Sequence, residues 1–214
     1  MKTIVLLFLF FFSSYLIAQK DSSVSTTSFD LYFGYRPSFQ SFYNQINTTS
    51  KFDLNTPLQI VGIGISGQFI VTRGDNFFGH FIYNQVIPKD ITLNDTIKCK
   101  ITGFNFSYGY GDAITSKTGL FSLYYYAGFN LGRLRTYSDE LARQKNFYFS
   151  PKIGIQPKIK IKNIAISLIV ECDYDITNPN WKHNTFSSRD QTKITKLRQS
   201  GVTGQIGIGY IIPN

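Results

Sequence analysis

Cysteine is scarce in this 214-residue chain, which contains only two, Cys99 and Cys172. Neither has a neighbouring ligand at the spacing of a metal site, so we expect no metal ion and no other cofactor. Exported proteins can join such residues in a disulfide. We expect two free thiols here, and the sequence leaves their pairing open.

Helix-forming residues such as Ala, Glu and Met are also scarce, whereas the chain contains 17 Gly, 14 Tyr and 20 Phe. This composition favours β-strands over helices. After the amino-terminal segment, no stretch approaches the 18 apolar residues that indicate a membrane-spanning helix. The sequence therefore predicts one all-β domain.

Residues 1–18 have the features of a cleavable secretory signal peptide. Lys2 precedes a short apolar run, and Ala18 provides a small residue at the predicted cleavage site. The run is shorter than the ~20 residues of a spanning helix. We expect an exported protein in which residues 19–28, rich in Ser and Thr, form a flexible linker and residues 29–212 form the domain.

The clearest structural signal lies in residues 146–175. Apolar residues occupy odd positions before Lys162-Asn163 and even positions after it, as expected for two strands joined by a two-residue turn. Folding about this turn places Lys152 opposite Asp173. Each arm is about twice the usual strand length of roughly 5–6 residues, which suits a tilted strand crossing ~30 Å of hydrocarbon. We interpret the segment as a transmembrane hairpin.

Similar alternation along the chain predicts eight strands, at residues 29–37, 57–72, 77–87, 96–111, 119–132, 146–161, 164–175 and 201–212. The first, third, fifth and seventh connections are the longer ones. Long outer loops that alternate with short periplasmic turns are typical of outer-membrane barrels. The prediction is an eight-stranded antiparallel up-and-down transmembrane β-barrel.

Two prolines lie within the predicted sixth strand, Pro151 and Pro157. A closed barrel has no free edge at which a missing N–H is harmless. Both prolines occupy odd positions, so both withdraw donors from the same neighbouring strand. We expect a bulge or a lost hydrogen bond there.

The end of the chain carries four spaced residues: Gln205, Gly207, Tyr210 and Ile212. They resemble the carboxy-terminal assembly signal of outer-membrane barrels, except that Ile212 replaces the usual aromatic residue and Pro213-Asn214 follow. With the signal peptide and the strand rhythm, residues 29–212 resemble the small eight-stranded outer-membrane barrels of Gram-negative envelopes, the OmpA/OmpX-like barrel domains. The resemblance implies an outer-membrane location, insertion by the assembly machinery, and a structural, surface or accessory role in secretion or assembly.

Seven charged residues share the strand faces opposite the apolar positions: Asp30, Arg36, Lys152, Lys158, Lys160, Glu171 and Asp173. They would point into the barrel, whose eight strands leave just enough room for side chains. Enclosed charges must be paired or hydrated. We expect a salt-bridged plug that fills the lumen, with a narrow ion path as the alternative.

His80 is the only histidine in a predicted strand. A lipid-modifying enzyme would need such a base beside a nucleophile, but nothing in the spacing selects Ser66 or Ser107 for that role. We expect a structural histidine and no enzymatic activity.

The last long connection, residues 176–199, is basic within a chain of net charge +9, and it contains Lys182, Arg189, Lys193, Lys196 and Arg198. Export argues against a nucleic-acid partner. Phosphates of outer-leaflet lipid or lipopolysaccharide are the nearest anions to such a loop. A solvated loop without a ligand and a loop that adheres to a protein stay open as alternatives.

Aromatic residues at the strand ends are predicted to form interfacial girdles: Phe29, Tyr35, Tyr108, Tyr110, Phe147 and Tyr210.

The same alternation of apolar and polar residues is also compatible with a different kind of barrel. A secreted lipocalin-like barrel would turn its apolar face inward to bind a small apolar ligand and its charges outward to water.

Overall fold

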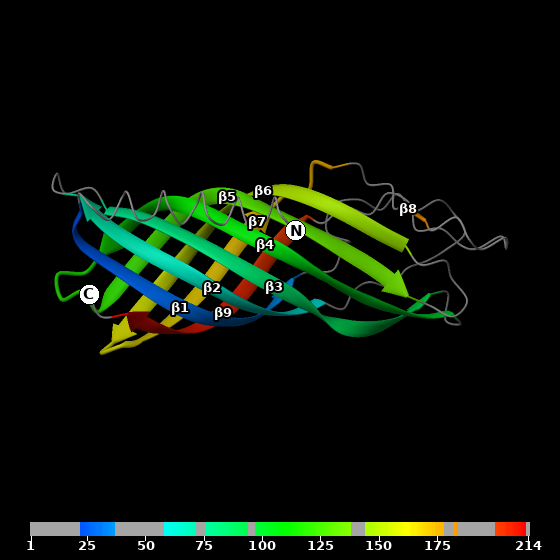
Figure 1. The fold of residues 1–214 in the computed structure, drawn as a ribbon, viewed down its shortest axis with the longest axis horizontal. Coiled ribbons are helices and arrows are strands. Elements are labelled where there is room, and N and C mark those ends of the chain that lie inside the picture. The colour runs from blue at the N-terminus through cyan, green and yellow to red at the C-terminus, as the bar shows by residue number, and fades with distance from the viewer. Residues whose placement is uncertain are drawn as a thin grey trace.

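The computed structural model describes residues 22–36, 58–71, 76–93, 97–137, 144–177, 182–183 and 200–212. The predicted signal peptide, residues 1–18, lies outside these ranges. Within them, no helix has the length and hydropathy needed to cross a membrane. The described segments form one antiparallel sheet that wraps into an elongated barrel (Figure 1).

Nine strands make up the sheet in these ranges: β1 (Ser22–Arg36), β2 (Leu58–Val71), β3 (Asn76–Leu93), β4 (Ile97–Thr115), β5 (Phe121–Tyr137), β6 (Gln144–Ile161), β7 (Ile164–Asp173), β8 (Lys182–His183) and β9 (Gly201–Ile212). Eight of them follow one another around the ring, and β9 pairs with β1 to close it. The short β8 pairs only with the start of β6. The predicted eight-stranded antiparallel barrel is confirmed.

The hairpin of β6 and β7 has the predicted register. Lys162 and Asn163 form the turn, and Lys152 lies opposite Asp173. Lys162 has a φ of 54°, in the left-handed region that tight hairpin turns require. This turn and residues 116–120 lie at the end of the barrel where β1 begins and β9 ends, which we call the turn end. The opposite end is the loop end.

The proline prediction is confirmed at Pro157. The register of β6 with β7 is unchanged from one end to the other, but the pairs Gln156–Ile169 and Pro157–Leu168 are missing from the ladder. The Tyr174 N–H donates to the Pro151 carbonyl at 3.1 Å, so backbone groups at odd positions of β6 point toward β7 and its continuation. Pro157 therefore supplies no donor to the Leu168 carbonyl.

β1 begins earlier than the sequence predicted. The flexible linker expected over residues 19–28 is corrected for residues 22–28, which pair with β2. Thr26 and Thr27 are β-branched residues, which favour strands, and Ser28 is buried against the barrel interior. This segment is therefore part of a strand, in which Ser28 supplies an inward polar group.

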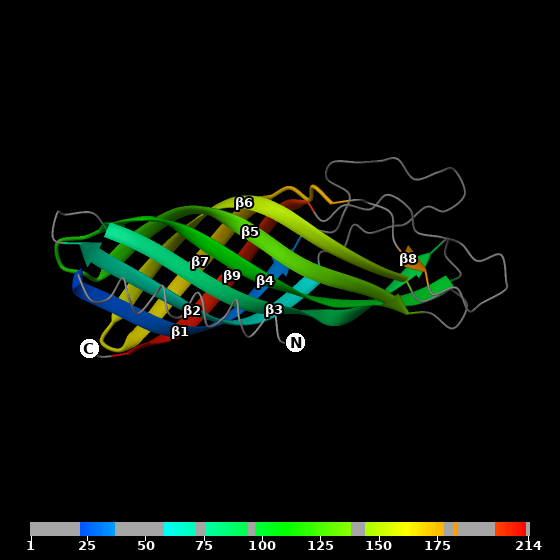
Figure 2. The same ribbon diagram turned by 45° about the horizontal axis from the view of Figure 1, so that its top comes forward.

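The third connection is much shorter than predicted. Residues 88–95 were expected to form a long loop, but β3 continues to Leu93 and β4 begins at Ile97. A register shift between Val86 and Lys89 accommodates the intervening proline. Because β4, β5 and β6 are also long, strands β3 to β6 extend past the rest of the barrel at the loop end (Figure 2).

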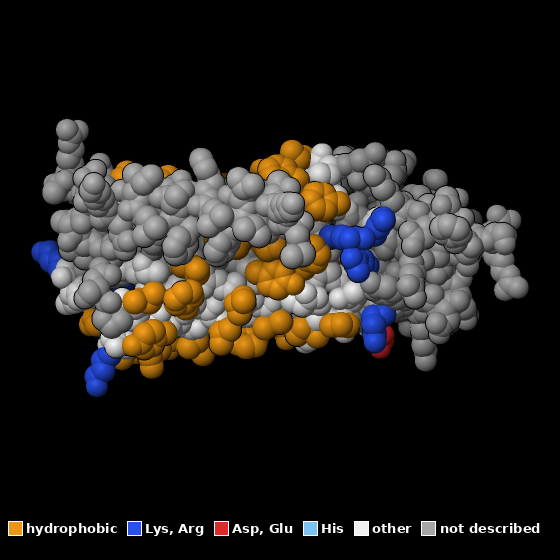
Figure 3. Space-filling model, in the orientation of Figure 1, with side chains coloured by type: hydrophobic (Ala, Val, Ile, Leu, Met, Phe, Trp, Pro, Cys, Tyr) orange, Lys and Arg blue, Asp and Glu red, His pale blue; other side chains and the backbone are white. Residues whose placement is uncertain are grey.

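The outer face is apolar around the middle of the barrel. Outward apolar side chains on β1, β2, β6, β7 and β9 are about half exposed, among them Phe33, Ile63, Ile155, Leu168 and Ile206. Figure 3 shows this band between Lys and Arg side chains at the two ends. We call it the apolar belt. Since the apolar face points outward and the charged face inward, the lipocalin-like alternative is wrong.

Candidate functional site

Three lysine or arginine ion pairs lie in the barrel interior among the described residues. Arg36 pairs with Asp173, Lys152 with Glu171 at 2.5 Å, and Lys158 with Asp30 at 3.3 Å. All six residues are at most 5% exposed. Isolated charges are costly to bury, so removing either partner of a pair would leave an unfavourable buried charge.

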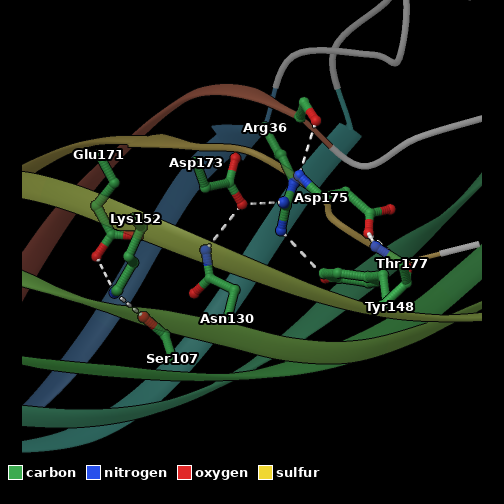
Figure 4. Close-up of polar contacts among 10 residues, drawn as sticks. Arg36, Ser107, Asn130, Tyr148, Lys152, Glu171, Asp173, Asp175 and Thr177 are labelled. Atoms are coloured by element: carbon green, nitrogen blue, oxygen red, sulfur yellow. Dashed lines mark hydrogen bonds and ion pairs between the residues drawn. The ribbon is translucent and has the colours of Figure 1, made fainter.

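The Arg36 pair lies nearest the loop end. The Arg36 guanidinium donates to the Tyr148 hydroxyl at 3.1 Å and lies 5.1 Å from the centre of that ring. Asn130 donates to the same Asp173 oxygen at 2.9 Å. Figure 4 shows Arg36 between Asp173 and Tyr148, with Asp175 close by.

The Lys152 pair lies deeper in the barrel. Lys152 also donates to Ser107, and the Tyr126 hydroxyl donates to Glu171 at 2.9 Å. His80 is 2% exposed, with its Nε2 3.2 Å from the Lys152 Nζ. Its ring packs edge-on against Tyr126 at 4.5 Å between centres. His80 and Ser107 are thus enclosed in a polar network that holds Lys152.

The Lys158 pair lies toward the turn end. Besides Asp30, Lys158 donates to Ser28 at 2.5 Å and to Ser66 at 3.0 Å. Both hydroxyls donate in turn to Asp30. Lys160 is only partly buried at the mouth, where its Nζ lies 3.1 Å from the Gln68 side-chain oxygen.

Apolar layers separate and cover the ionic ones. Phe78 stacks on Tyr124 at 4.0 Å between ring centres near the turn end, and Tyr32 packs with Ile82 and Ile169 in the middle. The loop end is filled by five buried aliphatic residues: Leu58, Ile60, Val86, Ile101 and Leu134. Sequence reasoning did not find this aliphatic layer. The parity of the predicted second strand, applied to Leu58 and Ile60, would have indicated it.

Little space remains between these layers. Two cavities among the described residues each hold about 10 Å³, one beside Arg36 and Leu58 and one beside Lys158 and Lys160. A volume of that size accepts about one water molecule. The lumen is therefore packed.

Basic residues lie on the outer face just beyond the apolar belt at the loop end. Lys100, Arg135 and Lys145 are exposed, and Arg133 is partly exposed beside Phe147. Arg135 lies opposite Lys145, which in turn lies opposite Lys182 of β8. We call these five residues the basic rim.

Of the predicted lipid contacts, Lys182 alone falls on a described strand. Arg189, Lys193, Lys196 and Arg198 lie outside the described residues. The sequence prediction omitted the four rim residues on β4, β5 and β6. Their parity with the neighbouring outward residues would have placed them on the outer face.

The predicted girdle residues lie near the turn end, near the loop end and within the apolar belt between the two ends. Phe29 lies opposite Tyr210 near the turn end, both more than half exposed. Tyr35 and Phe147 are each 56% exposed near the loop end. Tyr108 lies within the belt, with its ring 5.4 Å from that of Phe129.

The four residues of the predicted assembly signal alternate along β9. Gln205 and Gly207 face the interior, whereas Tyr210 and Ile212 lie on the outer side. A β-carbon on Gly207 would lie 2.5 Å from the Tyr32 ring and 2.6 Å from the Ser167 hydroxyl. Gly207 therefore makes room for the side chains that fill the middle of the barrel.

Cys172 is a free thiol on the outer face. Its backbone lies opposite Ile153 and Val202, within the strands of the belt.

A closed eight-stranded barrel with an apolar belt outside and ion pairs inside defines a small outer-membrane β-barrel protein. Its fold is similar to that of Ail, the attachment invasion locus protein of Yersinia pestis, with a TM-score of 0.51 and 13% identity over 88% of this chain and 98% of that one. Ail in complex with the heparin analogue sucrose octasulfate gives a TM-score of 0.48, with 15% identity over 88% and 99% of the two chains.

Neisserial surface protein A gives a TM-score of 0.43, with 10% identity over 88% of this chain and 96% of that one. No protein-family model and no curated protein matches the sequence. What this chain shares with Ail is therefore the fold.

Proposed function

We propose that this protein is a non-enzymatic outer-membrane barrel with a closed lumen, whose basic rim binds the phosphate groups of outer-leaflet lipopolysaccharide. The observation that carries the proposal is the position of the rim. Arg133 lies opposite Phe147 at the edge of the belt, and Arg135 and Lys145 follow one step further out. Lipid phosphates lie at that level of a membrane.

The charges of the rim support an anionic ligand. Arg135, Lys145 and Lys182 occupy adjacent positions on three neighbouring strands. A phosphate group at the outer face of these strands would make charge-assisted hydrogen bonds with the exposed Arg135 and Lys145 side chains.

The interior supports a closed and non-enzymatic barrel. Ser66, Ser107 and His80 are at most 2% exposed, and all three contact buried lysines. None of them offers a substrate an accessible nucleophile or base.

The test measures binding of the refolded protein to lipopolysaccharide and to its dephosphorylated form. The double variant Arg135→Gln/Lys145→Gln is expected to bind native lipopolysaccharide about tenfold more weakly or worse, because each charge near a lipid surface contributes about 1 kcal/mol. Its matched control is Lys117→Gln/Lys162→Gln, which removes two exposed charges at the turn end.

Added salt should weaken binding of the parent protein. Equal binding by the parent and the rim variant contradicts the proposal, as does an equal loss in the control variant.

A further inference from the structure

The connection that follows β7 continues along β6 instead of leaving the sheet. After Tyr174, the Ile176 N–H donates to the Phe149 carbonyl at 3.1 Å. Beyond it, β8 pairs with Gln144 and Lys145 at the start of β6. The described parts of this connection thus line the edge of β6 from the belt to the basic rim.

Asp175 joins the two ends of this connection. It is fully buried, and its N–H donates to the Ser200 hydroxyl at 2.8 Å. Its carboxylate accepts hydrogen bonds from the Thr177 N–H at 2.9 Å and from the Thr177 hydroxyl at 2.5 Å. Ser200 immediately precedes β9, so these bonds close the base of the connection.

Arg36 supplies positive charge to this base. Its guanidinium pairs with Asp173 at the end of β7, and Figure 4 shows Asp175 close to it. Lys152, the next cation inward, pairs with Glu171. Without Arg36, the buried Asp173 carboxylate would lose the cation with which it pairs, which costs several kcal/mol.

We propose that Arg36 is a positioning residue for the basic rim. By holding Asp173 and Asp175 inside the barrel, it keeps the connection on the edge of β6 and sets Lys182 beside Lys145. The value of this arrangement for binding rests on the proposed lipid contact, whereas the arrangement itself is tested without any lipid.

The test is disulfide trapping between β6 and β8. Gln144 lies opposite His183, a cross-strand position where Cβ atoms lie about 4.5–5.5 Å apart. The double variant Gln144→Cys/His183→Cys, with Cys99→Ser and Cys172→Ser, leaves every rim charge in place. Oxidation of the folded protein should join the two cysteines rapidly.

Adding Arg36→Gln should slow this trapping by about tenfold or more, and Arg36→Lys should have an intermediate effect. The matched control is Lys158→Gln, which breaks the ion pair nearest the turn end and should leave trapping unchanged. Rates are compared only for protein that migrates as the compact, unboiled band.

Ser200→Ala keeps the test decisive if Arg36→Gln does not fold. It removes the hydrogen bond between the Asp175 N–H and the Ser200 hydroxyl without touching an ion pair, and it should also slow trapping. Trapping at the parent rate in every folded Arg36 and Ser200 variant overturns the proposal but leaves the lipid contact untouched. Equal slowing in Lys158→Gln also overturns it, because the effect would then reflect general loosening.

Discussion

Lys152 lies opposite Asp173 across the β6–β7 hairpin, yet the two do not form an ion pair with one another. Lys152 binds Glu171, two residues earlier on β7, and Asp173 binds Arg36 of β1. β9 lies between β1 and β7 in the sheet. The Arg36 pair therefore links β1 and β7, two strands that are not neighbours in the sheet.

The variant Lys152→Met should destabilise the barrel by about 3–5 kcal/mol, because Glu171 is left buried without its cation. The double variant Lys152→Met/Glu171→Leu should recover much of that loss. Urea unfolding of the refolded protein in lipid vesicles measures both. A single variant as stable as the parent, or a double variant no better than the single, contradicts the ion-pair assignment.

Gly207→Ala should destabilise the barrel by about 1–3 kcal/mol, because its new β-carbon meets Tyr32 and Ser167. Gly204→Ala is the matched control on the same strand, since a β-carbon there meets nothing within 4 Å. Refolding in detergent takes place without any assembly machinery. A difference measured there therefore reports the packing role of Gly207 and not its recognition as part of an assembly signal. If the two variants refold with equal stability, Gly207 has no packing role.

Pro157→Val should stabilise the barrel by about 1 kcal/mol, because it restores an N–H facing the Leu168 carbonyl within the membrane. Part of the gain is lost to the greater freedom of the unfolded chain. Unfolding in vesicles gives the change in the free energy of unfolding. Amide hydrogen exchange shows whether the hydrogen bonds between β6 and β7 become continuous. Unchanged stability and exchange would mean that the interrupted ladder costs nothing.

The packed lumen predicts that the protein carries no steady current in a planar bilayer. The apolar layer of Leu58, Ile60 and Leu134 covers the ionic layers at the loop end, and the remaining cavities of about 10 Å³ are too small for a hydrated ion. A reproducible single-channel conductance would show that an ion path exists.

Alternation alone predicted the side of the sheet on which each charge lies, because a strand repeats every two residues. It also predicted the β6–β7 register, because a two-residue turn at Lys162-Asn163 requires Ile161 to pair with Ile164. It did not predict that Arg36 meets Asp173, because contacts across a lumen depend on strand tilt and stagger. The bulge at Pro88 concealed the length of β3, as its extra residue shifts the alternation.

The central claim is that the apolar belt faces lipid around a closed barrel, and gel migration of membrane fractions tests it most directly. Unboiled protein from the outer-membrane fraction should migrate as a compact, SDS-resistant band that shifts to its full apparent mass only after boiling. Protein found in the soluble fraction, and unfolded by SDS without heat, would contradict the account.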